Sequence, residues 1–336
     1  MPDAAADTRA GWNRPRFVPG DPAGHYESWF LRANHPARPL AFWIRYTIFS
    51  PRGRPEAAVG ELWAVWFDGA TGAIAAVKEE RPLAACAFGA EALLARVGDA
   101  VLDDGRLVGE ARTGAHALAW DLACGDGDAP LLLLPADLYA RGFPKAKALV
   151  PRPHAVFRGT MHVDGARHAI DGWVGSQNHN WGVRHTDRYA WGQVAGFDGA
   201  PEAFLECATA QVRLGPLWTP AMTLVVLRLG GERIALNGLG RALRARGRVD
   251  GLDWRFASAD RAVAVEGRIT APASRFVGLT YGNPPGGTKI CLNSKLAGCE
   301  LTLRRSGRTP VVLRTADRAA FEILDDAPRA GIPVVV

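Results

Sequence analysis

A stretch rich in aromatic and polar side chains holds the first candidates for chemistry. Residues 172–192 read GWVGSQNHNWGVRHTDRYAWG, which places histidines among indoles and amides. Large aromatic side chains bury much apolar surface, and polar groups among them need partners or a function. The pattern is typical of an apolar cavity wall that carries a few polar atoms. A β core with hydrogen-bonded histidines is an equally good interpretation.

His179 is the first candidate for chemistry in this stretch. If its backbone is extended, His179 and Trp181 point to the same side, because side chains alternate along a strand. The neighbouring amides, including Asn178, can fix the tautomer of the ring, and the indole can stack on a ligand. We therefore consider His179 a candidate catalytic residue, with a core histidine bonded to the backbone as the alternative.

Glu206 lies in the apolar segment 203–208, AFLECA. A carboxylate in such surroundings is costly unless it is paired, and burial raises its pKa. A raised pKa lets a general acid keep its proton at neutral pH. Phe204 shares its face of the strand. The alternative is a salt bridge between Glu206 and one of the many arginines.

Glu27 is a second candidate acid, because it stands next to Tyr26 and two residues before Trp29. Arg32 and Arg45 could pair with it, which favours a structural role more strongly than for Glu206.

Composition argues against several other classes of protein. The 336 residues carry a net charge of +6, but the arginines are scattered among acids, so no nucleic-acid partner is expected. The five cysteines form no CxxC pair, and the histidines at 162, 168, 179 and 185 lack acidic ligands at a recurring spacing. No metal site is expected. The chain also lacks the GxSxG, HExxH and GxGxxG motifs.

Targeting signals are not evident either. The first residues lack an apolar segment, and the longest aliphatic run is Leu131–Leu134. We expect a cytoplasmic protein with no integral membrane segment.

Short strand-like runs separated by turn residues dominate the rest of the chain. Leu40–Phe49 is apolar on both faces, as expected for a strand buried on two sides. Asp-Gly turns follow several runs. Helical periodicity is weak, with Phe88–Val97 and Ala316–Leu324 as ambiguous candidates. The pattern predicts an all-β protein: a flexible arm at 1–24 and two β domains at 25–148 and 149–336.

Four short motifs carry a resemblance to a known family. They are YESWFLRAN at 26–34, NHNWG at 178–182, YGN at 281–283 and CLN at 291–293. In this order they resemble the AttH-like and carotenoid 1,2-hydratase group, which is related to tocopherol cyclases and lipocalin-like Diels–Alderases. The resemblance implies two lipocalin-like β-barrel domains, an elongated apolar pocket near their interface, and no metal or organic cofactor.

The resemblance also implies roles for individual residues. A His-x-Trp pair and an aromatic-x-acid pair are implicated in alkene protonation in the hydratases, and here they match His179 with Trp181 and Phe204 with Glu206. At the aromatic-x-acid pair the hydratases have Tyr and Asp, whereas this chain has Phe204 and Glu206. We expect Glu206, His179 and Glu27 to be catalytic. We expect the substrate to contact Trp181, Trp191, Phe204, Tyr189, Trp29, Asn178 and Tyr281.

The function expected from these residues is a cofactor-independent enzyme for a hydrophobic isoprenoid, polyene or polyketide. Glu206 would protonate an alkene or epoxide, with His179 orienting the acid or a water, and this would lead to hydration or cyclisation. Transient contact with a membrane could supply the substrate. The alternatives are a pericyclic cyclase and a non-catalytic carrier of an apolar ligand.

Overall fold

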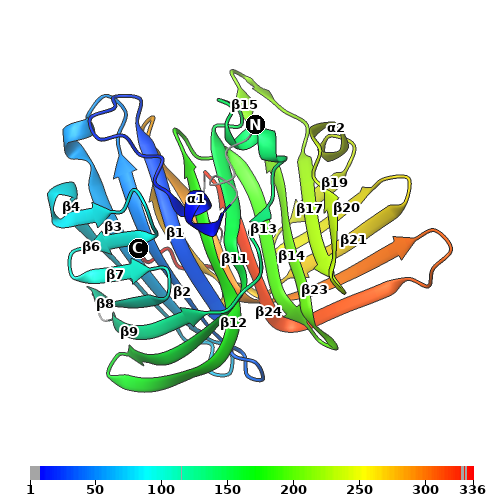
Figure 1. Cartoon of the computed structure of the whole chain (residues 1–336), viewed down its shortest axis with the longest axis horizontal. Coiled ribbons are helices and arrows are strands. Elements are labelled where there is room, and N and C mark those ends of the chain that lie inside the picture. Colours follow the sequence, from blue (N-terminus) through cyan, green and yellow to red (C-terminus); the bar gives the residue numbers. More distant parts are fainter. Residues whose placement is uncertain (1–7, 115, 327–328, 330) are drawn as a thin grey trace.

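The computed structural model describes residues 8–114, 116–326, 329 and 331–336, and the predicted all-β fold is confirmed (Figure 1). Two large antiparallel sheets make up most of the described residues. The short helices α1 (Arg9–Asn13) and α2 (Leu239–Ala242) and the hairpin of β15 (Arg213–Leu214) and β16 (Leu217–Trp218) lie beside them.

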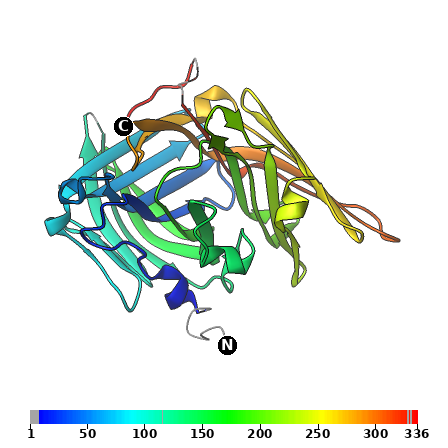
Figure 2. The ribbon, with the colours of Figure 1, turned by 90° about the horizontal axis from the view of Figure 1, so that it is seen from above.

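The first sheet curls into a nearly closed barrel (Figure 2). Where β4 approaches β8, Thr113 Oγ1 accepts a hydrogen bond from Lys78 N (2.8 Å) and donates one to Lys78 O (2.6 Å). A core of large rings fills the interior. In spatial order the strands are β4 (Ile74–Pro82), β3 (Val59–Asp68), β2 (Leu40–Ser50), β1 (His25–Asn34), β12 (Ala166–Gly182), β11 (Ala146–Val163), β9 (His116–Gly125), β8 (Arg106–Thr113), β7 (Ala100–Asp103), β6 (Leu94–Val97) and β5 (Cys86–Phe88), with β10 (Leu131–Leu132) beside β11.

The second sheet has its own apolar core, built around Trp254, Phe256 and Phe321. Its strands, in spatial order, are β18 (Glu232–Leu236), β17 (Met222–Leu229), β14 (Ala200–Gln211), β13 (Arg188–Phe197), β24 (Val311–Asp325), β23 (Thr288–Arg305), β21 (Val263–Thr270), β20 (Asp253–Ala259) and β19 (Arg246–Asp250), with β22 (Val277–Gly282) beside β23.

The chain passes from the first sheet to the second between β12 and β13. From sequence, the second domain was expected to begin at residue 149, within β11. Instead β11 and β12 pair with β9 and β1 and complete the first barrel. Pro151 and Pro153 lie within β11, which passes them with register shifts, whereas Pro144 precedes the strand.

Neither ambiguous helix candidate is helical in the structure. Residues 88–97 contribute to β5 and β6, and residues 316–324 lie in β24. Strand β24 pairs on one side with β13 and on the other with β23. Its backbone groups are therefore taken up by neighbouring strands, and this tertiary pairing overrides weak helical periodicity.

A third apolar cluster joins the two sheets. Phe30 and Trp43 of the first sheet pack here with Trp191, Leu279 and Tyr281 of the second. Strand β2 supplies both faces, since Phe42 and Tyr46 enter the barrel core while Trp43 enters the interface. This confirms the prediction that the strand is buried on two sides.

Candidate functional site

A cavity of about 190 Å³ lies between the two sheets. Its walls come from β1, β2, β11 and β12 of the first sheet and from β13, β14, β17, β22 and β24 of the second, and α2 and the segment before β11 also contribute to the lining. Phe143 and Leu239 belong to this lining and are 51% and 41% exposed, so they mark the side that opens to solvent. Most of the wall is apolar, and a few polar groups reach it.

Glu206 on β14 is one of these polar groups and is 2% exposed. Its Oε1 accepts a hydrogen bond from Trp191 Nε1 at 2.7 Å, and its Oε2 accepts one from Gln193 Nε2 at 2.9 Å. No ion pair joins Glu206 to a described residue, so the salt-bridge alternative is not what the structure shows. Burial raises its pKa to about 7, although both hydrogen bonds and the charge of Arg32 lower it.

Gln193 connects this acid to the interior. Its Oε1 accepts from Arg32 Nε at 2.8 Å and from Ser176 Oγ at 2.6 Å, and its Nε2 also donates to Asn178 Oδ1 at 2.8 Å. Arg32 thus reaches Glu206 through an amide rather than directly. The arrangement holds the amide in one orientation, with its NH₂ group toward the carboxyl.

A buried ion pair lies on the neighbouring wall. Lys295 Nζ is 2.8 Å from Glu322 Oε1 and also donates to Asn293 Oδ1 at 2.6 Å. Burial lowers the pKa of Lys295, and the charge of Glu322 opposes that effect. Glu322 lines the cavity, and Tyr189 lies near it, with its hydroxyl 3.5 Å from Oε2.

Aromatic rings are layered at another part of the wall. Tyr26 stacks on His185 with ring centroids 4.0 Å apart, and the guanidinium of Arg45 lies 4.4 Å from the centre of the Tyr281 ring. His185 Nε2 bonds to Gly282 O at 3.1 Å. Burial, and then the charge of Arg45, lowers the pKa of His185 to about 3, so its ring is neutral near pH 7.

His179 and Glu27 form a separate cluster. His179 Nε2 lies 2.7 Å from Glu27 Oε1, and Nδ1 lies 2.7 Å from the carbonyl oxygen of Trp12. Glu27 also accepts hydrogen bonds from the backbone N–H groups of Arg16 and Phe17. Burial alone would raise the pKa of Glu27, but hydrogen bonds and charge from His179 and His25 lower it to about 2.

This cluster anchors the segment around α1 to the first barrel. Trp29 Nε1 donates to Asn13 O at 3.0 Å, and Asn13 exchanges hydrogen bonds with Gln177 at 2.9 and 3.2 Å. Trp29 and Trp181 each lie 4.8 Å from the ring centre of His179. Residues 1–7 of the predicted arm lie outside the described residues.

The predicted site residues therefore fall into two groups. Glu206, Asn178, Tyr189, Trp191 and Tyr281 line the cavity. Glu27, Trp29 and Trp181 surround His179 in the anchoring cluster, and His179 borders the cavity with both ring nitrogens bonded elsewhere.

Two of the expected contacts differ in the structure. Glu27 pairs with histidines rather than with Arg32 or Arg45, because the register of β1 with β12 brings His179 across from Trp29. Phe204 lies outside the cavity lining, in a small apolar cluster with Val150 and Val226.

Sequence analysis did not assign five polar residues to this region: Gln193, Arg45, His185, Lys295 and Glu322. Lys295 and Arg45 carried a usable signal, since each is a charged residue inside a strand that is otherwise largely apolar. Glu322 carried the same signal, in the apolar run AAFEIL at 319–324, whereas Gln193 and His185 give no comparable local signal.

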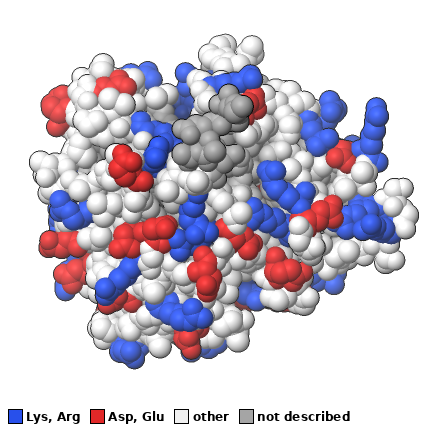
Figure 3. Space-filling view, viewed as in Figure 1, with Lys and Arg blue, Asp and Glu red and all other residues white. Residues whose placement is uncertain are grey.

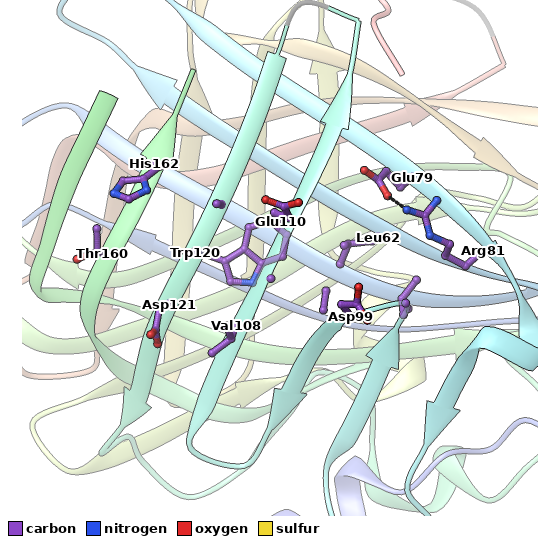
Figure 4. A pocket seen from close by; sticks show the side chains of 15 residues that line it. Leu62, Glu79, Arg81, Asp99, Val108, Glu110, Trp120, Asp121, Thr160 and His162 are labelled. Atoms are coloured by element: carbon purple, nitrogen blue, oxygen red, sulfur yellow. Dashed lines mark hydrogen bonds and ion pairs between the residues drawn. The ribbon is translucent and has the colours of Figure 1, made fainter. Parts of the chain in front are cut away.

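A larger hollow of about 530 Å³ lies over β8, β9 and β11 and near the end of β4 (Figure 4). Much of its lining is charged, and Asp99, Glu110, Asp121 and His162 are exposed. Glu79 and Arg81 form an ion pair at its edge. Exposed charges of both signs are typical of a solvated surface, so the smaller apolar cavity is the better candidate site.

Three further properties bear on the type of site. Within the described residues, no group of three His, Cys, Asp or Glu side chains is placed to hold a metal ion. The described helices include none with the length and apolar character needed to cross a membrane. On the face drawn in Figure 3, basic and acidic side chains are interspersed.

Comparisons with known proteins agree with this architecture. No family model matches the chain. An uncharacterized protein of Mycobacterium tuberculosis, present in strains CDC 1551 and H37Rv, is 27% identical over 302 residues, covering 87% of this chain and 85% of the relative.

Solved structures show the same fold at low identity. An AttH-like protein of Nitrosomonas europaea superimposes with a TM-score of 0.58 at 12% identity, covering 95% of this chain and 99% of the other. Kievitone hydratase of Nectria haematococca gives 0.57 at 11%, covering 95% and 96%. CghA, crystallised with Sch210972, gives 0.54 at 12%, covering 96% and 97%. The resemblance to the AttH-like group is thus confirmed at the level of the fold.

Proposed function

We propose that the protein is an enzyme that protonates an alkene or epoxide of a hydrophobic substrate, with Glu206 as the acid. The observation that carries this proposal is a carboxyl group 2% exposed, in the wall of an apolar cavity, held by two neutral donors and ion-paired to none of the described residues. With its pKa raised to about 7, a large fraction of this group keeps its proton at neutral pH.

The chemistry needs no further reagent than water. The Glu206 O–H bond breaks as its proton adds to one alkene carbon, and the other carbon becomes cationic. Attack by a water oxygen, followed by return of a proton to the Glu206 carboxylate, gives an alcohol. Attack by a second alkene of the substrate, followed by proton loss, gives a ring. Faces of Trp43, Trp191 and Phe30 lie around the cavity and can stabilise the cation.

The role of His179 follows from its contacts. Both of its ring nitrogens are engaged, by Glu27 and by the carbonyl of Trp12, rather than by Glu206. We assign His179 and Glu27 as positioning residues that hold the segment around α1 against the barrel. Gln193 and Trp191 take the place of His179 as the groups that orient the acid.

Two features of the site bear on the substrate. The cavity volume lies below the roughly 300–1,000 Å³ of sites for drug-sized ligands, so a long polyene would extend through the mouth. The mouth carries the exposed apolar side chains Phe143 and Leu239. Transient contact of this mouth with a membrane surface would supply an apolar substrate. The name of the structurally similar kievitone hydratase agrees with a hydration reaction.

The proposal is tested with a panel of isoprenoid, polyene and polyketide alkenes in D₂O, with products analysed by mass spectrometry. The wild-type protein should add deuterium at a carbon of one substrate class, and Glu206→Gln should lose this activity by about a hundredfold or more. Glu300→Gln, an exposed acid paired with Arg314, serves as the control and should retain full activity.

The same experiment separates the two alternatives. Turnover without deuterium incorporation, unchanged in Glu206→Gln, would support a pericyclic cyclase. Tight binding without turnover across the panel would support a carrier and contradict the enzyme.

A further inference from the structure

Arg45 is a buried cation that forms no ion pair with a carboxylate of the described residues. It extends from β2, is 4% exposed and lines the cavity. Its Nε and Nη2 both donate to the single hydroxyl of Ser28, at 2.8 and 2.6 Å. Within the described part of the chain, its Nη1 donates to no acceptor. A guanidinium stays charged at any physiological pH, and Glu61 and Glu322 support this charge from a distance without forming an ion pair with it.

The acids that could neutralise Arg45 are already engaged. Glu322 is paired with Lys295 at 2.8 Å, and Glu61 is paired with Lys78 at 3.1 Å. The phenols beside Arg45 carry no charge at neutral pH, since burial raises the pKa of Tyr26 and of Tyr281. The groups near Arg45 therefore leave a donor facing the cavity without an anion.

Arg32 shows that such a vacant donor is not a general property of the buried arginines here. Arg32 is fully buried, and its nitrogens donate to Gln193 Oε1, Gln193 O and Asn34 Oδ1 at 2.6 to 3.2 Å. Arg32 is absent from the cavity lining, whereas Arg45 belongs to it. Arg32 therefore has the contacts of a structural arginine, whereas Arg45 has a donor available to a ligand.

The neighbours of Arg45 suit a planar, conjugated acidic group. The Tyr281 ring supports the guanidinium from one side at 4.4 Å, which leaves its edge for a planar partner. His185 bonds to Gly282 O through Nε2, and its Nδ1 has no partner among the described residues. An acceptor, His185 Nδ1, and a donor, Arg45 Nη1, therefore lie in the same part of the wall, at a distance from the Glu206 carboxyl.

We propose that Arg45 binds the oxyanion of a carboxylate or enolate on the substrate, so that the substrate is an apolar chain with an acidic oxygen head. The head would pair with the edge of the guanidinium through charge-assisted hydrogen bonds, and the chain would extend past Trp43 and Trp191 toward Glu206. This inference deepens the proposed function, because it assigns the substrate class of the same cavity.

Equilibrium binding tests the proposal without requiring turnover. The probes are geranic acid, its methyl ester, and a 2-acyl cyclohexane-1,3-dione with a matching chain, followed by quenching of tryptophan fluorescence at neutral pH. The wild-type protein should bind the acid or the enolised dione at least about tenfold more tightly than the ester. The acid that binds more tightly identifies the class of the head group.

Variants assign this preference to Arg45. Arg45→Met keeps the length of the side chain and removes the charge, so it should bind acid and ester equally while keeping its affinity for the ester. Arg45→Lys should keep part of the preference. Arg152→Met removes another buried arginine, which bonds to Cys124 O and Asp104 away from the cavity. This variant should keep the full preference for the acid.

Two outcomes would overturn the inference: a wild-type protein that does not prefer the acids, including one that binds no probe, and an acid preference that survives in folded Arg45→Met. Failure of the proposed function looks different. Glu206→Gln should lose turnover and keep the acid preference, whereas Arg45→Met should lose the preference.

Discussion

The indole of Trp191 on β13 donates a 2.7 Å hydrogen bond to the carboxyl of Glu206 on β14, and both side chains line the cavity between the sheets. A neutral donor can satisfy either protonation state of a carboxyl oxygen without adding charge. The pair therefore lets Glu206 remain buried while burial holds its pKa near 7. A cation in the position of Trp191 would have made the same acid permanently ionised.

Stability should depend on pH through Glu206. The pKa of Glu206 rises from 4.5 to about 7 on folding, so the native state binds more protons than the unfolded state between these values. Its unfavourable contribution is absent below about pH 4.5, grows as pH rises, and is complete above about pH 7, at on the order of 3 kcal/mol. Urea unfolding across pH should show this loss in the wild-type protein and not in Glu206→Gln.

Glu27 should show the opposite pH dependence. Its pKa is lowered to about 2, so the stability it contributes is present above pH 4.5 and is lost as pH falls toward 2. Glu27→Gln should destabilise the fold by about 3–5 kcal/mol, because the imidazole of His179 loses its buried partner.

The segment around α1 should also loosen in this variant, since Glu27 holds the backbone at Arg16 and Phe17. Limited trypsin digestion should cut at Arg16 faster than in the wild-type protein. Glu56→Gln, at an exposed site, is the control. Unchanged digestion would show that the Glu27 contacts do not anchor the segment.

Trp191→Phe should raise the pKa of Glu206 further. The hydrogen bond from Trp191 is the larger of the two that lower this pKa, so its removal leaves burial less opposed. If Glu206 is the acid, the alkaline limb of the pH–rate profile should shift to higher pH in this variant. Trp254→Phe removes another buried indole, which donates to Thr209, and should leave that limb in place.

The pair of Lys295 and Glu322 should behave as one unit. Lys295→Met leaves Glu322 as a buried charge without its cation and should cost about 3–5 kcal/mol in the free energy of unfolding. The double variant Lys295→Met with Glu322→Gln should recover most of that loss. Additive effects of the two changes would contradict a coupled pair.

Much of the fold could be predicted from local pattern. Alternation predicted the strands, including β14, on which Glu206 faces the cavity while Leu205 and Cys207 enter the second core. The same alternation explains the motif at 178–182: Asn178 turns toward the network of Gln193, and His179 turns toward the segment around α1.

The partners of these residues could not be read from the sequence. His179 meets Glu27 because β1 and β12 pair across a long separation in the chain, and Glu206 meets Gln193 through the register of β13 with β14. Local sequence does not fix which strands become neighbours. The sequence therefore identified Glu206 and His179 correctly as buried. It predicted that the two act together, whereas in the structure their polar contacts belong to separate clusters.

The central claim is that Glu206 inside the cavity keeps its proton in a large fraction of molecules near pH 7. Infrared spectroscopy measures this directly, as the carbonyl stretch of a protonated carboxyl in the difference between wild-type protein and Glu206→Gln over a pH titration. We predict a protonated band that disappears with a midpoint near pH 7. A Glu206 that is fully ionised at every pH above about 5 would contradict the account.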